Sequence, residues 1–414
     1  MKTTLTTLAV LLLGPPDVRT AELKLTLLCL LALGVPQPPA LLACSTAVFG
    51  PAATADGAPL LWKNRDTDVL SNKVVFVPEK PFSYLGLVNA EETSGRSVYA
   101  GLNAEGFAIF NSVAFNLPAP PTEMKDLEGQ IMADALRTCR TVDDFETYLR
   151  KNLGKSLGSQ ANFGVLDAAG HAALFEVHNH GYQKLDAVAA PDGYLINTNF
   201  SRSGPQGKGL GYLRFERARS LVAQAGGKVS PRFVLDTLAR DFGNALVPAP
   251  SLAELASLSG KSPHFLSTED SLCRAHTSAA VVIQGRRPGP NGPPATMWVA
   301  IGEPLCSLAV PLWVEAGATP ALLHEGQDAP LCREAARIRK LLRPCEETDK
   351  VKYIDVTRLA NQEGTGFLPA LQQAQQTIYE ATATFFQTPH TAAEFVQFQD
   401  RMAADALAAL QKIR

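Results

Sequence analysis

The sequence predicts an α+β protein in which two β-sheets are packed between layers of helices. Three observations predict it. Short β-prone runs bounded by Gly, Asn or Pro fill most of residues 45–117, segments with helix-period apolar residues come next, and a second block of strands and helices follows. Each sheet has to bury a face, so two sheets with helices on their outer sides give a four-layer αββα arrangement. The apolar content of 46% is sufficient for such a core.

The elements are expected in a definite order. The strands, which are short, β-prone and bounded by turn residues, are expected at 45–49, 73–77, 84–88, 98–102, 107–113, 162–166, 172–177, 182–185, 193–197, 278–283 and 296–301. The helices, which place apolar residues at helical spacing, are expected at 128–139, 142–149, 212–224, 231–242, 334–342 and 392–413. Thr141 is placed to cap the second of these helices.

The first 43 residues resemble a removable secretory signal. Residues 25–35 form an apolar run preceded by Lys24, and a proline-rich stretch ending in the small residue Ala43 follows. The run is too short and too interrupted by proline to span a bilayer. We therefore expect cleavage after Ala43, export to the periplasm or the extracellular space, and a mature chain that begins at Cys44.

Charge and cysteine spacing exclude several classes of function. The net charge is −2, without a basic stripe for nucleic acid or a polybasic membrane patch, so a small molecule is the expected partner. The cysteines show no zinc-binding spacing, and we expect neither a metal nor another cofactor. Cys273 with Cys306, and Cys332 with Cys345, are possible disulfides in an exported protein. The oligomeric state stays open.

Cys44 admits three interpretations. As an N-terminal residue it would carry a nucleophilic thiol and a basic α-amine together. The sequence Leu-Leu-Ala-Cys at 41–44 also resembles a lipobox, and a lipid on Cys44 would abolish both functions and leave a surface-anchored binding lipoprotein. A papain-like enzyme would instead pair Cys44 with a histidine, but papain-like nucleophiles do not precede a strand. The histidines available for that pairing are His171, His178, His180, His276 and His390.

Four motifs downstream favour the first interpretation. Cys44 is followed by NRD (64–66), GLNAEGFAIFNS (101–112), INTNF (196–200) and YLRF (212–215). In this order they resemble the N-terminal-nucleophile (Ntn) cysteine hydrolases, a group that includes choloylglycine hydrolases, penicillin V acylases and isopenicillin acyltransferases. The resemblance covers roughly residues 44–310. The chain departs from the family pattern at Lys63, where an arginine is common, and at Tyr212, where serine is.

The resemblance implies a role for each of five residues. Cys44 would be the nucleophile, activated by its own α-amine; Asp66 would hold that amine; Asn111 and Asn199 would donate to the oxyanion; and Arg214 would favour the thiolate. Taken singly, the aspartate and both asparagines also fit turn positions, and the arginine fits a solvated helix face. The order of the five is what supports catalysis.

The implied reaction is cleavage of a linear amide bond of an N-acyl small molecule through a thioester, with water or an acceptor amine resolving it. A bile salt, a penicillin or an N-acyl amino acid would all fit. Substrate contacts are expected from apolar residues in two loops, namely Phe82, Tyr84 and Met124. Residues 44–310 would form the Ntn catalytic domain, and 311–414 a mostly helical C-terminal extension.

Overall fold

The computed structural model describes residues 44–92, 94–118, 125–154, 157, 159–287, 292–345 and 349–414. They belong to one compact unit, Leu42–Arg414. The expected signal segment and Met124, one of the three residues expected to contact substrate, lie outside the described residues.

The first sheet has six strands and contains the start of the predicted mature chain. Neighbouring strands in this sheet are all antiparallel to each other. In spatial order the strands are β10 (Tyr194–Asn197), β1 (Ser45–Phe49), β2 (Leu60–Asp66), β12 (Thr277–Gln284), β13 (Thr296–Ile301) and β14 (Val310–Leu312). The strand that begins next to Cys44 therefore lies between β10 and β2, in the interior of the sheet.

The second sheet has seven strands, each paired antiparallel with the next along the chain. They are β3 (Asn72–Val77), β4 (Tyr84–Asn89), β5 (Ala100–Asn103), β6 (Ala108–Val113), β7 (Gln160–Leu166), β8 (Ala172–His178) and β9 (Gly181–Asp186). A small separate sheet pairs β11 (Phe265–Ser267) with β15 (Tyr353–Asp355). Short 3-10 turns occur at η1 (Pro51–Ala53), η4 (Pro304–Cys306), η5 (Val314–Ala316), η6 (Ala321–Leu323), η7 (Asp349–Lys352) and η8 (Val356–Arg358).

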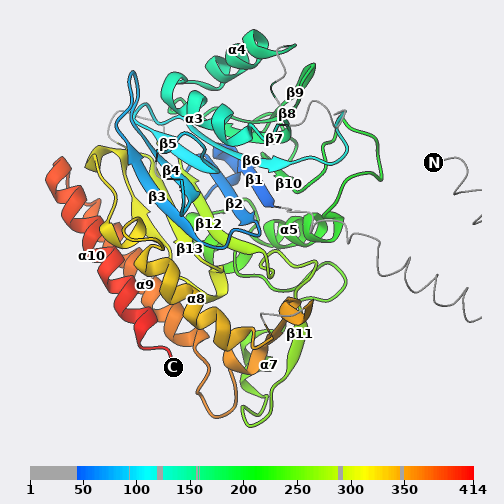
Figure 1. Ribbon diagram of the computed structural model, residues 1–414, viewed down its shortest axis with the longest axis vertical. Helices are drawn as coiled ribbons and strands as arrows, with labels where there is room; N and C mark the ends of the chain where they lie inside the picture. Colours follow the sequence, from blue (N-terminus) through cyan, green and yellow to red (C-terminus); the bar gives the residue numbers. More distant parts are fainter. Residues whose placement is uncertain are drawn as a thin grey trace, which may run out of the picture. The chain divides into compact units, whose positions relative to one another are not determined.

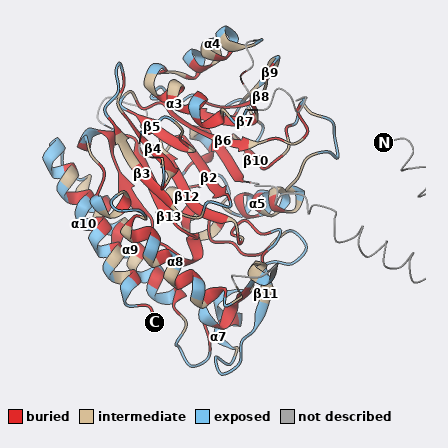
Figure 2. Ribbon diagram, viewed as in Figure 1, coloured by how far each residue is buried: buried red, intermediate tan, exposed pale blue. Residues whose placement is uncertain are grey.

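The two sheets pack face to face, since β1 and β2 contact β6, β7 and β8. α3 (Glu128–Thr138) and α4 (Val142–Asn152) cover the outer face of the seven-stranded sheet, where a cluster of aromatic and aliphatic side chains is buried. The helices associated with the six-stranded sheet are α5 (Tyr212–Gln224), α6 (Pro231–Phe233) with η3 (Val234–Leu238), α7 (Leu252–Ala256), α8 (Pro330–Leu342), α9 (Leu368–Phe385) and α10 (Ala392–Gln411). Figure 1 shows this layering, and Figure 2 shows the strands buried and the outer helix faces exposed.

The predicted α+β architecture with two sheets between helical layers is confirmed. Most expected elements agree with the structure to within a few residues, and two differ for local reasons. The helix expected at 231–242 ends at Leu238, and the helix expected at 334–342 begins at Pro330, whose fixed φ suits a first helical turn. The domain boundary expected at residue 310 coincides with the first residue of β14 and remains a prediction. No helix in the described ranges combines the length and apolar character needed to cross a bilayer.

Candidate active site

Strand pairing places Cys44 between two strand ends. β1 pairs with β2 through Ser45 opposite Asn64, and with β10 through Thr46 opposite Asn197. The residue before Ser45 therefore reaches the end of β2 on one side and the turn after β10 on the other. Cys44 is 8% exposed, and its Sγ lies 3.5 Å from the backbone nitrogen of Asp66.

The carboxylate of Asp66 is fully buried and held at both oxygens. Arg274 Nε donates to Oδ2 at 2.6 Å, and Thr277 Oγ1 donates to Oδ1 at 2.7 Å. Both partners are absent from the motifs read in the sequence. Thr277 lies directly opposite Asp66 across the β2–β12 pairing, so the sheet itself brings the two together.

Arg214, at the start of α5, joins Cys44 to Asn199. Its Nη1 donates to the Cys44 carbonyl and to Ser45 Oγ, each at 2.8 Å, and its Nη2 donates to Asn199 Oδ1 at 2.8 Å. Burial, followed by repulsion from Arg274, lowers the pKa of Arg214 to about 10. Gly211 is required here: its φ is +86°, and a Cβ would collide with the Arg214 guanidinium.

Asn111, on β6, is oriented by Lys63 on β2. Lys63 Nζ donates to Asn111 Oδ1 at 2.6 Å and to the Tyr99 carbonyl at 2.9 Å. Because the carboxamide oxygen is fixed in this way, the Asn111 Nδ2 group is turned to the opposite side. Burial lowers the pKa of Lys63 to about 8, although the negative charges that Cys44 and Asp66 can carry act in the opposite direction.

The strand that carries Asn111, β6, is hydrogen-bonded to the segment after β10 that carries Asn199. Asn199 Nδ2 donates to the Val113 carbonyl at 2.9 Å, and Ser112 Oγ donates to the Thr198 carbonyl at 2.9 Å. The Asn199 amide has a second hydrogen beyond the one given to Val113. The two asparagines thus lie on neighbouring segments, and Asn199 is linked to Cys44 through Arg214.

Arg65, the other cation next to Asp66 in the sequence, contacts residues outside the expected site. Its guanidinium stacks on the Tyr99 ring at 3.6 Å and binds Asn72 and Asn89. Lys63, rather than Arg65, therefore contacts a residue of the expected site. Of the five residues that the motifs singled out, four are connected through these contacts, namely Cys44, Asp66, Asn199 and Arg214, and Arg274 and Thr277 join them at Asp66. The fifth, Asn111, is bonded to Lys63.

Two of the three residues expected to contact substrate, Phe82 and Tyr84, lie within the described part of the chain. Tyr84 is packed in the outer core of the seven-stranded sheet with α3, and its hydroxyl donates to the Gly95 carbonyl at 2.9 Å. It also lines a cavity of about 510 Å³ whose lining includes Glu79, Arg96 and Arg137 but not Cys44. Phe82 is buried, and the guanidinium carbon of Arg140 lies 5.0 Å from the centroid of the Phe82 ring. The pleat directs Tyr84 into the outer core, and the substrate role expected for these two residues stays a prediction.

The other cysteines and the histidines have different partners. Burial raises the pKa of Cys139 to about 12 and those of Cys273 and Cys306 well above the ordinary thiol value. Cys273, Cys306 and Cys332 are thiols, so neither possible disulfide is present. Where the structure describes the chain, the contacts of Cys44 are with Asp66 and Arg214, and none is with a histidine.

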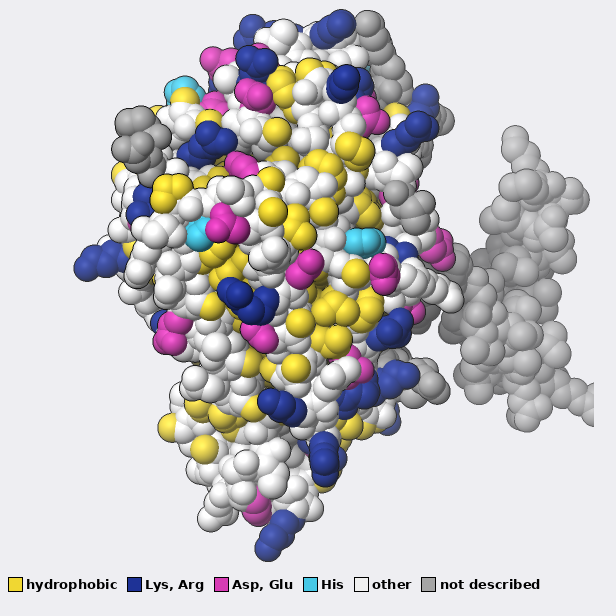
Figure 3. Space-filling model, turned by 90° about the vertical axis from the view of Figure 1, so that its left-hand side faces the viewer, with side chains coloured by type: hydrophobic (Ala, Val, Ile, Leu, Met, Phe, Trp, Pro, Cys, Tyr) yellow, Lys and Arg dark blue, Asp and Glu magenta, His cyan; other side chains and the backbone are white. Residues whose placement is uncertain are grey.

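The molecular surface drawn in Figure 3 carries side chains of both charges scattered among hydrophobic ones. Lys and Arg do not form a continuous stripe on this face.

No protein-family model and no curated protein sequence matches the chain. Among solved structures, it is similar to conjugated bile acid hydrolase from Clostridium perfringens, with 12% identity, coverage of 63% of this chain and 89% of the other, and a TM-score of 0.37. It is also similar to penicillin V acylase from Agrobacterium tumefaciens, with 14% identity, coverage of 65% and 85%, and a TM-score of 0.38.

Proposed function

We propose that this chain is an exported N-terminal-cysteine amidohydrolase, which becomes active when the peptide bond before Cys44 is cut and then hydrolyses a linear amide bond of an N-acyl small molecule. One observation carries the proposal. Arg214 donates to the Cys44 carbonyl and to the Asn199 carboxamide oxygen, and the Cys44 Sγ lies 3.5 Å from the backbone nitrogen of Asp66, whose buried carboxylate is held by Arg274 and Thr277. A cysteine that serves only for packing does not need a buried carboxylate and a buried arginine beside it.

The reaction follows from the groups in place. Cys44 Sγ attacks the amide carbonyl carbon while its proton passes to the α-amine of the same residue. The carbonyl oxygen becomes an oxyanion, which the Nδ2 groups of Asn111 and Asn199 receive; each such donor is worth about 2.7–4 kcal/mol. The C–N bond then breaks, and the leaving amine departs with the proton.

The resulting thioester is resolved by water. The α-amine of Cys44 takes a proton from the attacking water, the acid is released, and the thiol is regenerated. Asp66 orients the amine throughout, because Arg274 and Thr277 fix both of its oxygens. An acceptor amine in place of water would make the same thioester an acyl-transfer intermediate.

The placement of Cys44 argues against the lipid-anchored alternative. The thiol belongs to an 8%-exposed residue at the start of an interior strand, and Arg214 binds its carbonyl. A diacylglyceryl group on Sγ would have to displace these contacts.

The test uses the chain exported with its own first 43 residues. Intact mass and N-terminal analysis should give a mature protein beginning at unmodified Cys44. That protein should hydrolyse at least one member of a panel containing penicillin V, glycocholate and N-acyl amino acids, with added amines testing for acyl transfer. Acid quenching should trap the acyl mass on the Cys44 peptide.

Cys44→Ser should stay folded and lose most turnover, by about 10³-fold or more. Cys139→Ser is the matched control, because Cys139 is a buried thiol in the outer helical layer and should be dispensable for activity. Undiminished turnover by Cys44→Ser would remove this residue from the mechanism. Lipid on Cys44 would end the catalytic proposal altogether.

A further inference from the structure

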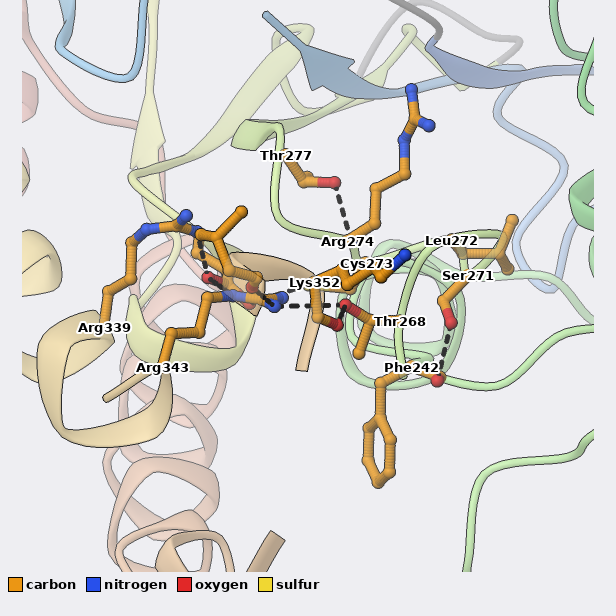
Figure 4. Close-up of polar contacts among 12 residues, drawn as sticks. Phe242, Thr268, Ser271, Leu272, Cys273, Arg274, Thr277, Arg339, Arg343 and Lys352 are labelled. Carbon is orange, nitrogen blue, oxygen red and sulfur yellow. Dashed lines mark hydrogen bonds and ion pairs between the residues drawn. The ribbon is translucent and has the colours of Figure 1, made fainter. Parts of the chain in front are cut away.

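The segment 268–277 connects the proposed catalytic centre with a second buried charge cluster. At one end, Arg274 and Thr277 hold the two oxygens of Asp66, and Thr277 Oγ1 also accepts from the Arg274 backbone nitrogen at 3.0 Å. The other end begins at Thr268, whose hydroxyl accepts from Arg343, the residue that follows α8. Figure 4 shows Arg339 and Arg343 approaching this segment from the helix.

The second cluster is centred on Glu303, whose carboxylate is fully buried. Arg343 donates to it through Nε at 2.9 Å and Nη2 at 2.7 Å, and Arg339 Nη1 forms a further ion pair. The remaining Arg343 nitrogen, Nη1, donates to Thr268 Oγ1 at 3.1 Å and to the Val351 carbonyl at 2.8 Å. α8 is thereby bound both to Glu303 and to the first residue of the segment.

The middle of the segment is fixed as well. Leu272 receives a hydrogen bond at its carbonyl from Asn64 Nδ2 at 2.9 Å, and Ser271 Oγ donates to the Phe242 carbonyl at 2.7 Å. Cys273 Sγ lies 4.0 Å from Glu303 Oε1, one residue before Arg274. A displacement of Glu303 or Thr268 would therefore be passed to Arg274 along a short segment whose residues Ser271 to Cys273 are buried and held by hydrogen bonds.

We propose that Arg343 and Glu303 are positioning residues for the catalytic centre. By clamping segment 268–277 from α8, they keep Arg274 and Thr277 on Asp66, and Asp66 in register with Cys44. The inference rests on the proposed function and assigns a role to the C-terminal helical region, which contributes no residue to the site itself. Arg274 and Thr277 lie 208 and 211 residues from Asp66 in the sequence, and the pairing of β2 with β12 places Thr277 opposite Asp66.

The test compares three variants of the processed protein. Thr268→Val keeps the side-chain shape and removes the hydroxyl that links Arg343 to the segment. Arg343→Lys keeps the charge and loses the forked geometry. Gln375→Met is the control: Gln375 is a buried α9 residue that exchanges hydrogen bonds of 2.7 and 3.1 Å with the Ala309 backbone, far along the chain from segment 268–277.

Two readouts separate positioning from stability. With the best substrate of the panel, Thr268→Val and Arg343→Lys should lower kcat about tenfold or more with little change in KM, because misplaced catalytic groups slow the chemical step more than binding. The rate of Cys44 alkylation by iodoacetamide, followed by peptide mass spectrometry against pH, should shift its midpoint by about 0.5 pH unit or more. Gln375→Met should lose stability and change neither quantity.

The alkylation profile needs no substrate, so it tests the inference even if the wild-type protein cleaves no amide in the panel. A profile for Thr268→Val that coincides with those of the wild type and Gln375→Met would overturn the positioning role, whatever the activity. If Arg343→Lys does not fold, Thr268→Val alone decides.

Discussion

The carboxylates of Asp66 and Glu303 lie at the two ends of segment 268–277, and both are completely buried and held by arginine. Glu303 faces two arginines of one helix, whose other N–H groups bond to Thr268 and to backbone oxygen. Asp66 faces one arginine and one hydroxyl, and its own backbone nitrogen points at a thiol sulfur. The same residue types thus build two clusters with different neighbours.

The two clusters differ in the groups that their buried cations face. Near Asp66, three further cations, Lys63, Arg65 and Arg214, are buried within electrostatic reach of Cys44. Buried cations in excess of carboxylates stabilise any anion formed among them, which in this place is a thiolate or an oxyanion. At Glu303 both arginines are directed at one carboxylate, and the remaining Arg343 nitrogen bonds to Thr268 and to a backbone carbonyl.

The comparison is tested most strongly by Asp66→Asn. This variant keeps the size of the side chain but removes the charge that orients the amine, and it should lower kcat/KM about 10³-fold, or about 4 kcal/mol. Assays at a temperature where circular dichroism shows the variant folded separate this loss from unfolding. Activity within tenfold of the wild type would show that the two clusters do not differ in function.

Glu303→Gln should lower the stability of the fold more than it lowers the activity. Removing one partner of a buried ion pair leaves Arg343 uncompensated, and the free energy of unfolding should fall by about 3–4 kcal/mol. The folded fraction should retain more activity than Asp66→Asn, with a loss of about tenfold transmitted through segment 268–277. Urea denaturation monitored by tryptophan fluorescence measures the first quantity. A variant as stable as the wild type would contradict the structural role given to Glu303.

Lys63 lets pH sharpen the comparison. Burial lowers its pKa from 10.5 to about 8, so between these values the unfolded chain binds a proton that the folded chain has released. Stability should therefore rise with pH across this window, and relative to Lys63→Met the gain from pH 7.5 to 10 should be about 2 kcal/mol. Denaturation curves at both pH values measure it. Parallel behaviour of wild type and variant would place Lys63 in solvent.

The sequence was informative where a site residue stands in a local pattern. Cys44 follows a cleavage-type segment, Asp66 ends a strand, and Asn199 lies in a short turn, so each has neighbours that mark it. Arg274 and Thr277 have none. They are 208 and 211 residues away from Asp66, and only the pairing of β2 with β12 brings them to it.

The substrate residues show a second limit. Both faces of the seven-stranded sheet are buried, one against the other sheet and one against α3 and α4, so apolar residues occupy alternate positions on both. An apolar pattern of this kind identifies a strand but does not say which face turns toward the site. Tyr84 therefore looked like a pocket residue and lies in the outer core. The layered fold was predictable for the complementary reason, since strand and helix periods are local properties.

Glu128, at the start of α3, extends the comparison to a third buried carboxyl, which accepts a hydrogen bond from the Gln160 backbone nitrogen at 3.3 Å rather than an arginine. Burial, with the neighbouring Asp126 second, raises its pKa to about 7. Between its ordinary value of 4.5 and about 7 the folded chain binds the extra proton, so this carboxyl makes stability fall as pH rises through that window. Glu128→Gln, which cannot ionise, should remove a loss of about 2 kcal/mol between pH 5 and 7, read from paired denaturation curves. If the variant and the wild type show the same dependence of stability on pH, the Glu128 carboxyl ionises normally. Arginine pairing would then not be what distinguishes Asp66 and Glu303 from Glu128.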